Sequence, residues 1–404
     1  MQKVRIGILG FGNRAYSFAV PLLTAQFNTQ AEIIAVCDSN ELKLDFARGT
    51  LRAFPQVHYC REISALLALR PDVVFVTTPQ FAHAACAIAA LEAGCDVFLE
   101  KPMARSSAEC RAIIAAEKRS GRRVFMGFNL RFNPVCAKTL ELITAGRIGR
   151  VQQMVCTDYY SGGFSYFRRW HRLRANSGGL TVEKGCHSID QLNSYAGSIP
   201  VRVAAFGGLY RFKPDPEGAD YCSNCGKADT CPYYLDMAKA EEATRINTGI
   251  DGIVVNGGEK LDLCVFNSDK DTNDNITIII EYENSVRASL VECFTSSCQA
   301  TTGRQFIING WDGQIWTELK NRKIQVFDNA PGKPALPPEL PAIPTGSGNH
   351  GGADNQMLEY VISTIAHDQP NREMLTRDGY YAVAVAEAAE RSVEERRMIE
   401  IEKL

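Results

Sequence analysis

The sequence lacks an excess of charge of either sign, a long apolar run and a leader pattern. Its 404 residues carry 44 Lys and Arg against 46 Asp and Glu, a net charge of −2, and no basic patch of the kind that binds nucleic acid. No apolar run is long enough to span a bilayer. The N-terminus enters a strand-like run at once, without a signal-peptide pattern. We therefore expect a cytoplasmic protein without nucleic-acid or membrane partners.

Cysteine, by contrast, is abundant, with 14 residues. Without a leader pattern, these are expected to be buried thiols or metal ligands rather than disulfides. Cys222, Cys225 and Cys231 have the spacing C-x₂-C-x₅-C, and Cys264 could complete a four-sulfur site. Such a closed site would hold structural zinc. Because no second C-x₂-C is present, a set of buried or exposed thiols and an iron–sulfur cluster stay open as alternatives.

The most informative stretch lies at the start of the chain. An apolar run from Val4 leads into Gly10-x-Gly12-x-x-Ala15, and a helix pattern follows. This is the spacing of a dinucleotide-binding turn. Gly10 permits the tight turn, Gly12 lets the backbone approach a pyrophosphate, and Ala15 allows close packing of helix on strand. The N–H groups at the start of the helix would then face the phosphates.

The end of the next strand-like run supports this reading. The run Glu32–Cys37 ends at Asp38, where an acid can accept hydrogen bonds from both adenosine ribose hydroxyls. The same carboxylate would repel a 2′-phosphate, so NAD is favoured over NADP. The alternative is that Asp38 only caps the following helix. Pro21 falls inside the predicted first helix and is expected to kink it.

The pattern along the chain indicates two architectures. Strands and helices alternate up to about Phe128, which predicts a doubly wound α/β domain with a parallel sheet over residues 1–128. From 129 to 345 several strands follow without helices between them, which predicts an α+β domain with a mostly antiparallel sheet. The proline-rich stretch Pro331–Pro344 is predicted to be an extended tether. Residues 346–404 are predicted to form helices, over Ala353–Ala366 and Arg377–Ile399, that pack on both domains.

Several motifs in this order resemble those of the glucose–fructose oxidoreductase/inositol dehydrogenase (Gfo/Idh/MocA) family. They are Gly10-Phe11-Gly12-Asn13-Arg14, Thr77-Thr78-Pro79 with His83, Glu100-Lys101-Pro102, Asn129-Leu130-Arg131, and Gly178-Gly179 running through His187 to Asp190. The resemblance implies a Rossmann domain followed by an open, mostly antiparallel sheet. It also implies a set of cofactor-binding residues: Gly10, Phe11, Gly12, Asn13, Arg14, Asp38, Thr78, Pro79, His83, Glu100, Lys101 and Asn129.

The resemblance gives Lys101 and His187 catalytic roles. Lys101 would bond the reacting hydroxyl between nicotinamide and substrate, and a lysine beside a cofactor and other cations can have a lowered pKa. His187 would be the acid/base partner, since the hydroxyl loses its proton as hydride leaves carbon. Many family members have aspartate four residues before this histidine, whereas this chain has Glu183. Lys184, three residues before His187, is expected to face the substrate and to take part in catalysis, and whether Glu183 points into the site stays open.

Substrate contacts are expected from Arg131, Trp170, His171, Glu183, Asp190 and His350. Trp170 could stack on a pyranose face, and Arg169 or His171 could bond hydroxyls or a carboxylate. The alternative is that the aromatic residues of this loop belong to the core. His350 lies in a His-Gly-Gly segment that returns to the active site in related sequences, or else caps a helix.

The function expected from these residues is NAD-dependent hydride transfer to or from a hydroxyl carbon of a sugar, cyclitol or derivative. The first alternative is a glycosidase of the same family that oxidises its sugar transiently and regenerates NAD. The second is a non-catalytic binding or regulatory protein, which the presence of Lys101 and His187 disfavours. The resemblance also implies a homodimer or homotetramer, with contacts from the alternating strand Val286–Phe294.

Overall fold

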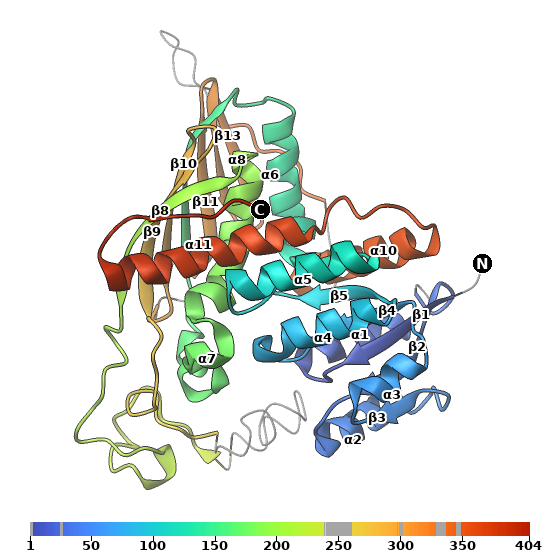
Figure 1. Ribbon diagram of the computed structural model, residues 1–404. Coiled ribbons are helices and arrows are strands. Elements are labelled where there is room, and N and C mark those ends of the chain that lie inside the picture. The colour runs from blue at the N-terminus through green and yellow to red at the C-terminus, as the bar shows by residue number, and fades with distance from the viewer. Residues whose placement is uncertain are drawn as a thin grey trace.

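Two β-sheets organise the chain, one in each half (Figure 1). A six-stranded sheet is built from the first 127 residues, and an eight-stranded sheet is built almost entirely from residues 151–328. The computed structural model describes residues 3–24, 27–237, 239, 261–296, 298, 302–328, 337–344 and 349–404. No helix in these ranges combines the length and the apolar character that a bilayer crossing requires.

The first sheet is parallel throughout, with the order β3-β2-β1-β4-β5-β6. Its central strands are apolar on both faces and buried because helices cover both sides. The strands are β1 (Val4–Leu9), β2 (Ala31–Cys37), β3 (His58–Cys60), β4 (Val73–Val76), β5 (Asp96–Glu100) and β6 (Val124–Gly127). The helices are α1 (Asn13–Leu22), α2 (Glu41–Thr50), α3 (Ile63–Ala68), α4 (Gln80–Glu92) and α5 (Ser107–Ser120). The predicted doubly wound architecture is confirmed, with the strand order reversing beside β1.

Pro21 does not interrupt the first helix. It lies in the last turn of α1, which ends at Leu22. The hydrogen bond that Pro21 cannot donate would join it to Ser17, so the loss is confined to the last turn, and the Leu23 N–H still bonds the Ala19 carbonyl oxygen.

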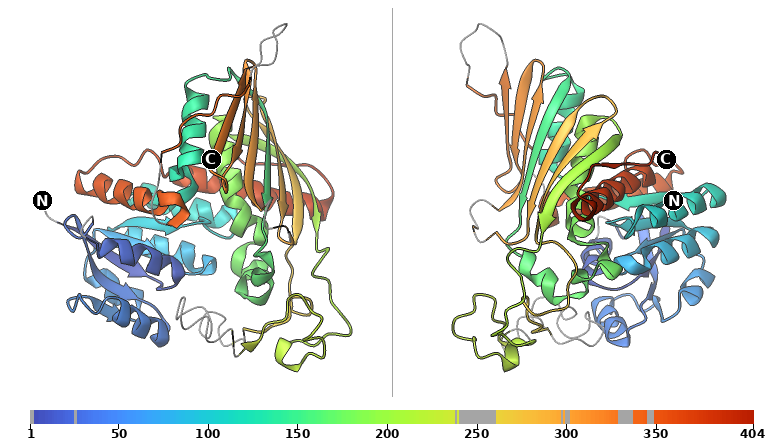
Figure 2. Two further views of the ribbon diagram at one scale, coloured as in Figure 1. Left: turned by 180° about the vertical axis from the view of Figure 1, so that it is seen from behind. Right: turned by 60° about the vertical axis from the view of Figure 1, so that its left-hand side comes forward.

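The second sheet is mixed and mostly antiparallel, with the order β13-β12-β11-β7-β10-β9-β8-β14. Its one parallel pair among the described strands is β7 with β10. The strands are β7 (Val151–Tyr159), β8 (Pro200–Gly208), β9 (Asn275–Tyr282), β10 (Arg287–Cys293), β11 (Gly303–Gly310), β12 (Gly313–Glu318), β13 (Lys323–Asp328) and β14 (Ile399–Glu400). Helices α6 (Pro134–Thr144) and α8 (Cys186–Ala196) pack on one face, and no helix of the described residues covers the other face (Figure 2).

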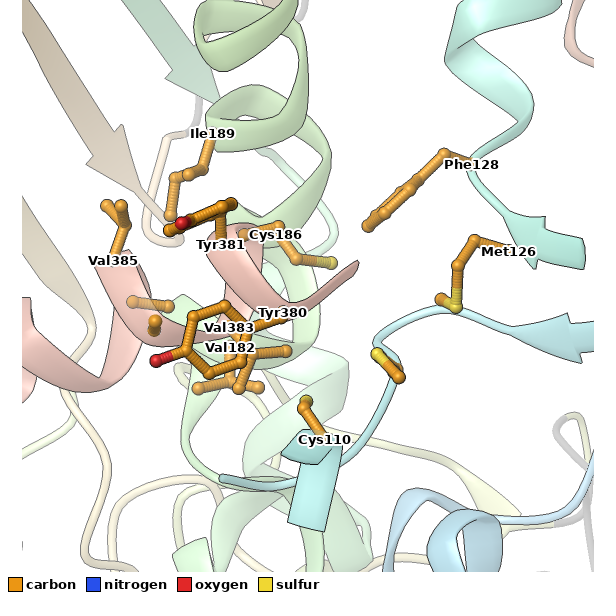
Figure 3. Close-up of a cluster of buried hydrophobic side chains, with 14 of the residues drawn as sticks. Cys110, Met126, Phe128, Val182, Cys186, Ile189, Tyr380, Tyr381, Val383 and Val385 are labelled. Carbon is orange, nitrogen blue, oxygen red and sulfur yellow. The ribbon is translucent and has the colours of Figure 1, made fainter. Parts of the chain in front are cut away.

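The long helix α11 (Thr376–Glu395) joins the two halves. Its buried side chains Tyr380, Tyr381, Val383 and Val385 meet Val182, Cys186 and Ile189 from α8 and the turn before it, and Met126 and Phe128 from the end of β6 (Figure 3). This shared apolar core fixes the second sheet and its helices against the carboxyl ends of the parallel strands, where ligands bind in such folds.

The last helix ends earlier than its pattern predicts. Arg396 adopts a left-handed backbone conformation, with φ 53°, which terminates α11 at Glu395. The following residues form the short strand β14, which pairs with β8. The helix α10 (Ala353–Ala366) has the predicted bounds. Of the predicted tether, residues 331–336 lie outside the described residues, and the part from 337 to 344 is irregular apart from one bridge between Glu339 and Val326.

Candidate active site

The turn after β1 has the geometry that its glycines predict. Gly10 has φ +87°, and a Cβ atom there would lie 2.8 Å from the Thr78 backbone nitrogen. Around Gly12 a Cβ would meet nothing within 4 Å. Helix α1 begins at the next residue without a side-chain cap. The first-turn N–H groups therefore face open space, as an anion site at a helix start requires.

Asp38 is buried at the carboxyl end of β2 and holds this turn in place. Its Oδ2 accepts a hydrogen bond of 2.8 Å from the Phe11 N–H, and its Oδ1 accepts one of 2.9 Å from the Asn40 N–H. The cap of α2 is Asn40, whose side chain accepts from the Leu42 N–H. Asp38 is thus not the helix cap, and each of its oxygens keeps a second lone pair for a ligand.

Two cavities meet at the edge of the parallel sheet. The adenosine-side cavity has a volume of about 630 Å³ and is lined in part by Asp38. The lysine-side cavity has a volume of about 270 Å³ and is lined in part by Gly12, Lys101 and Glu183. Both are lined by Lys43, Thr77, Thr78, Pro79 and Trp170. The shared walls make one groove that passes the glycine turn and ends at Lys101.

The groove fits a dinucleotide. Among the described residues, the Thr78 hydroxyl and the Gln80 side-chain oxygen are buried without a hydrogen-bond partner, and both residues line the lysine-side cavity. Unpaired buried polar atoms cost free energy unless a ligand satisfies them. With the uncapped start of α1 and the Asp38 carboxylate, they would hold the phosphates and the ribose of an NAD-type cofactor.

Lys101, directly after β5, is held by Glu183. Its Nζ donates a hydrogen bond of 2.9 Å to the Glu183 carbonyl oxygen and one of 3.0 Å to Glu183 Oε1. The second carboxylate oxygen, Oε2, is buried and has no partner in the part of the chain that the structure describes. Glu183 therefore does point into the site, where it fixes the position of the ammonium group.

This pairing reverses the expected electrostatics of Lys101. Burial lowers its pKa, but the attraction of Glu183, with smaller contributions from Cys186 and Glu100, outweighs burial and raises it. The expectation of a lowered pKa for Lys101 is wrong, because its nearest charged partner is a carboxylate rather than a cation. At neutral pH the side chain is an ammonium group that can stabilise negative charge on a bound oxygen.

His187 lies in the first turn of α8, where its ring is 6.2 Å from that of Phe128. Burial, together with repulsion by Lys101, Arg304 and Lys184, lowers the pKa of His187 well below its ordinary value. The imidazole is thus neutral at neutral pH and able to accept a proton. Its Nδ1 is buried and has no hydrogen-bond partner among the described residues.

The residues before His187 form a single π-helical turn, Thr181–Gly185, rather than the start of a regular helix. Turns of this kind are frequent at functional sites. Here the wider turn presents Glu183 to Lys101 and brings Gly185 against the second sheet, where a Cβ would lie 2.7 Å from Glu292 Oε2. Lys184, in the same turn, lies with its Nζ 4.1 Å from the centroid of the Tyr160 ring.

The second sheet contributes a buried charged row beneath this turn. Asp158 on β7 is opposite Glu292 on β10 and Arg304 on β11 in the strand register. Arg304 bonds Asp158 at 2.8 Å and donates to the Ser188 hydroxyl at 2.8 Å. The row connects the sheet to the helix that carries His187.

An aromatic wall runs from Lys184 to the cofactor groove. The ring centroids are separated by 6.0 Å for Tyr160–Tyr166, 5.0 Å for Tyr166–His171, 3.8 Å for His171–Trp170 and 6.1 Å for Trp170–Phe81. Trp170 and His171 both line the lysine-side cavity. Trp170 is therefore not a core residue, and it borders the cofactor groove as well as the space beyond Lys101.

Other predicted site residues converge on Asp354, at the start of α10. Asp354 accepts from Arg14 at 3.1 Å and from Asn129 at 2.9 Å, and it contacts His350 Nδ1 at 2.9 Å. Arg14 also bonds Glu100 at 2.8 Å. These side chains link the cofactor turn, β5 and the segment of His350, so His350 is neither a simple helix cap nor directly in the cavity wall.

Three further predicted residues support their neighbours. The His83 ring contacts the carbonyl oxygens of Thr78 and Pro102, each at 2.9 Å, and ties the two loops of the groove together. Arg131 and Asp190 form a bidentate ion pair, in which the guanidinium donates to Oδ1 at 2.6 Å and to Oδ2 at 2.9 Å. Asp190 is buried. Because each satisfies the other, the structure gives Arg131 and Asp190 a positioning role for α8 in place of the expected substrate contact.

The cysteine loop does not support the expected zinc site. Among the residues that the structure describes, no three His, Cys, Asp or Glu side chains are grouped so as to hold a metal ion. The Arg168 guanidinium lies 3.4 Å from the Cys222 sulfur. Its positive charge would repel a metal ion bound at this sulfur. The loop is ordered by carboxylates instead, since Asp262 accepts from the Ser223 N–H and Asp215 pairs with Lys227. Cys225, Cys231 and Cys264 are thus free thiols of this loop.

Sequence reasoning missed the charged row and part of the aromatic wall. The row lies on three neighbouring strands whose residues alternate between buried and more exposed positions. Its members, Asp158, Glu292 and Arg304, occupy inward-facing positions, where apolar residues are expected. A charged residue at such a position could have indicated the row from the sequence, because charged side chains are rarely buried without a partner. No local signal connects Tyr160 to Lys184, because their contact depends on how α8 lies over the sheet.

The comparisons agree with this geometry. The family model described as "Oxidoreductase family, NAD-binding Rossmann fold" matches residues 4–128, and its companion, "Oxidoreductase family, C-terminal alpha/beta domain", matches residues 140–401. The putative oxidoreductase YteT of Bacillus subtilis is 26% identical over 98% of this chain and 97% of its own. Inositol 2-dehydrogenase of Rhizobium meliloti is 28% identical over 61% of this chain and 69% of its own.

Among solved structures, levoglucosan dehydrogenase in complex with NADH and levoglucosan is similar in fold. It has a TM-score of 0.74 at 18% identity, with all of both chains covered. Both family models match, and together they cover the two sheets and the helices that position Lys101 and His187. The chain belongs to the Gfo/Idh/MocA family of oxidoreductases.

Proposed function

We propose that the protein is an NAD-dependent dehydrogenase that acts on a CH–OH group of a sugar, cyclitol or sugar derivative. The observation that carries this proposal is the Lys101 ammonium group at the end of the dinucleotide groove, fixed at 3.0 Å by Glu183 with the neutral His187 on the next helix. A cation and a neutral base are what alcohol oxidation requires at the reacting oxygen. The inositol 2-dehydrogenase relative supports the substrate class.

The roles follow from charge and position. Bound NAD would supply the hydride acceptor at the end of the groove. Lys101 donates a hydrogen bond to the substrate hydroxyl and stabilises the negative charge that develops on its oxygen. His187 accepts the hydroxyl proton, since its lowered pKa keeps the ring neutral until that moment. Glu183 holds the ammonium in place, and Asp354 and its partners hold the loops of the groove.

The direct test is a panel of sugars and cyclitols with NAD, followed by absorbance of NADH at steady state. Net NADH formation with at least one member supports the proposal. Release of an aglycone from a glycoside without net NADH would instead identify the transient-oxidation glycosidase. Tight NAD binding with neither reaction, over a panel that includes glycosides, would favour a non-catalytic role.

We expect NAD to bind more tightly than NADP because the buried Asp38 carboxylate would face the 2′-phosphate. Lys43 Nζ is 3.9 Å from this carboxylate and offsets part of its charge. Replacing Asp38 by alanine should narrow the difference between the two dissociation constants, measured by calorimetry. The Asn40→Ala variant, which removes only the cap of α2, is the matched control and should keep the wild-type ratio. Equal affinities in the wild type would contradict the cofactor preference.

We also propose a homo-oligomer that uses the open face of the second sheet. On the expected strand β10 this face has no exposed large apolar residue, whereas exposed Phe206, Ile279 and Trp316 lie on β8, β9 and β12. Replacing Ile279 and Trp316 together by lysine and glutamine should shift the molar mass, measured by light scattering, toward the monomer. A monomer in the wild type at micromolar concentration would contradict this proposal.

A further inference from the structure

Cations outnumber carboxylates around the lysine-side cavity. Lys101 is paired with Glu183 at 3.0 Å, and Arg304 is paired with Asp158 at 2.8 Å. Lys184 and Arg169 are left over: within the described ranges, neither side chain has an ion pair or a side-chain hydrogen bond, and Lys184 has only the Tyr160 ring. Arg169 lines the same cavity as Lys101 and Glu183.

The nearby Glu292 does not compensate these charges. It is 1% exposed, and neither of its carboxyl oxygens has a hydrogen-bond partner among the described residues. A buried carboxylate without partners is strongly disfavoured, so such a group takes up a proton. Burial and the Asp158 charge beside it raise the pKa of Glu292 well above its ordinary value. With Glu292 neutral, neither Lys184 nor Arg169 has a carboxylate partner among the described residues.

Both unpaired cations lie close to the groups that would act on the reacting hydroxyl. Lys184 lies in the π-helical turn directly before the helix that carries His187. Its charge lowers the pKa of His187, and so does that of Lys101. Arg169 lines the lysine-side cavity beside Trp170 and His171, toward the other end of the aromatic wall from Lys184. A neutral sugar would leave both cations unpaired in a partly dehydrated site.

We infer that the substrate carries a carboxylate, as an aldonic or uronic acid does, and that Lys184 and Arg169 bind this group while Lys101 and His187 act on a hydroxyl. The inference rests on the proposed dehydrogenase function and narrows its substrate class. A carboxylate would form charge-assisted hydrogen bonds with both cations, which are stronger than those between neutral groups.

The test uses matched pairs of substrates that differ in one carboxylate. Glucose with glucuronate, galactose with galacturonate, mannose with mannuronate, and glucose with gluconate are assayed for NADH formation. In pairs with an active member, kcat/KM for the acid is expected to exceed that for the neutral sugar by about ten- to a hundredfold, as charged hydrogen bonds allow. The advantage should shrink as ionic strength rises, because salt screens the attraction.

Substitutions of Lys184 and Arg169 test whether these two residues cause the preference for the acid. Lys184→Met removes the charge at similar length and should raise KM for the acid at least tenfold, whereas Lys184→Arg should keep most of the preference. Arg169→Gln should act in the same direction. Arg150→Gln, at the far end of β7 where the guanidinium packs on Trp311 at 5.6 Å, is a control that should leave the preference unchanged.

The pH dependence provides an independent readout. Burial, with Arg304 and Lys101, lowers the pKa of Lys184 to about 8, and Asp158 and Glu183 only partly oppose this shift. Above that pH the substrate-free enzyme loses the Lys184 charge, so KM for an acid should rise while KM for a neutral substrate changes little. Lys184→Met should abolish this rise.

The outcomes separate the inference from the proposed function. Activity on neutral sugars with no gain from a carboxylate overturns the inference and leaves the dehydrogenase standing. An Arg169→Gln variant that weakens NADH binding, together with a Lys184→Met variant that keeps the acid preference, also overturns it. If no member of the panel is oxidised, calorimetry with the NADH complex and glucuronate, galacturonate and gluconate decides: binding that Lys184→Met abolishes supports the inference, and no binding of any acid contradicts it.

Discussion

Replacing Lys101 by methionine is expected to lower kcat by ~10²–10⁴-fold, the range that a group acting in proton transfer contributes. The substitution replaces the side chain by an uncharged one of similar length and removes the ammonium group that Glu183 Oε1 binds. Without it, the developing charge on the substrate oxygen loses the ammonium group that Glu183 positions, and Glu183 is left buried beside the groove without its partner. The measurement is NADH formation under saturating NAD and substrate.

NADH affinity distinguishes this role from a structural one. Fluorescence titration should give a dissociation constant for the methionine variant within a few-fold of the wild type, because the glycine turn and Asp38, which would hold the phosphates and the ribose, are unchanged. Glu183→Gln is the matched variant, since it keeps Lys101 but removes the charge that raises its pKa. Near-normal turnover of the methionine variant would remove Lys101 from the mechanism.

The order of the parallel strands and the place of the cofactor turn follow from local patterns. Continuous apolar runs such as Val73–Val76 can be buried only in a sheet covered on both faces. Gly10 has a backbone conformation that other residues rarely adopt, and Gly12 leaves open space beside the turn, so the glycine spacing indicates this turn without the structure. Lys101 could be placed at the same edge because parallel strands end together.

The electrostatics of the site could not be read in this way. The contact of Glu183 with Lys101 depends on a π-helical turn, and no sequence pattern distinguishes that turn from the first turn of a regular helix. The sign of the Lys101 pKa shift depends on this one contact. The cysteine spacing, in contrast, predicted metal ligands that the structure does not support, because Arg168 lies against the Cys222 sulfur.

Arg304→Met is expected to destabilise the fold by about 3–5 kcal/mol, the cost of removing one partner of a buried ion pair. Arg304 is the only cation that Asp158 contacts within the described residues, at 2.8 Å, and Asp158 is 2% exposed. The loss leaves a buried charge beside Glu292, which also has no partner. The free energy of unfolding, from urea titration, is the measurement.

A second substitution shows whether charge or packing is responsible. Adding Asp158→Asn to Arg304→Met removes the stranded carboxylate, and a neutral pair costs much less than a single buried charge, so the double variant should recover a large part of the lost stability. Arg304→Lys keeps a cation but not the hydrogen bond of 2.8 Å to the Ser188 hydroxyl, and should fall between the two. A double variant no more stable than Arg304→Met would show that the guanidinium acts through packing, and that the charged row does not hold the helix of His187 on the sheet.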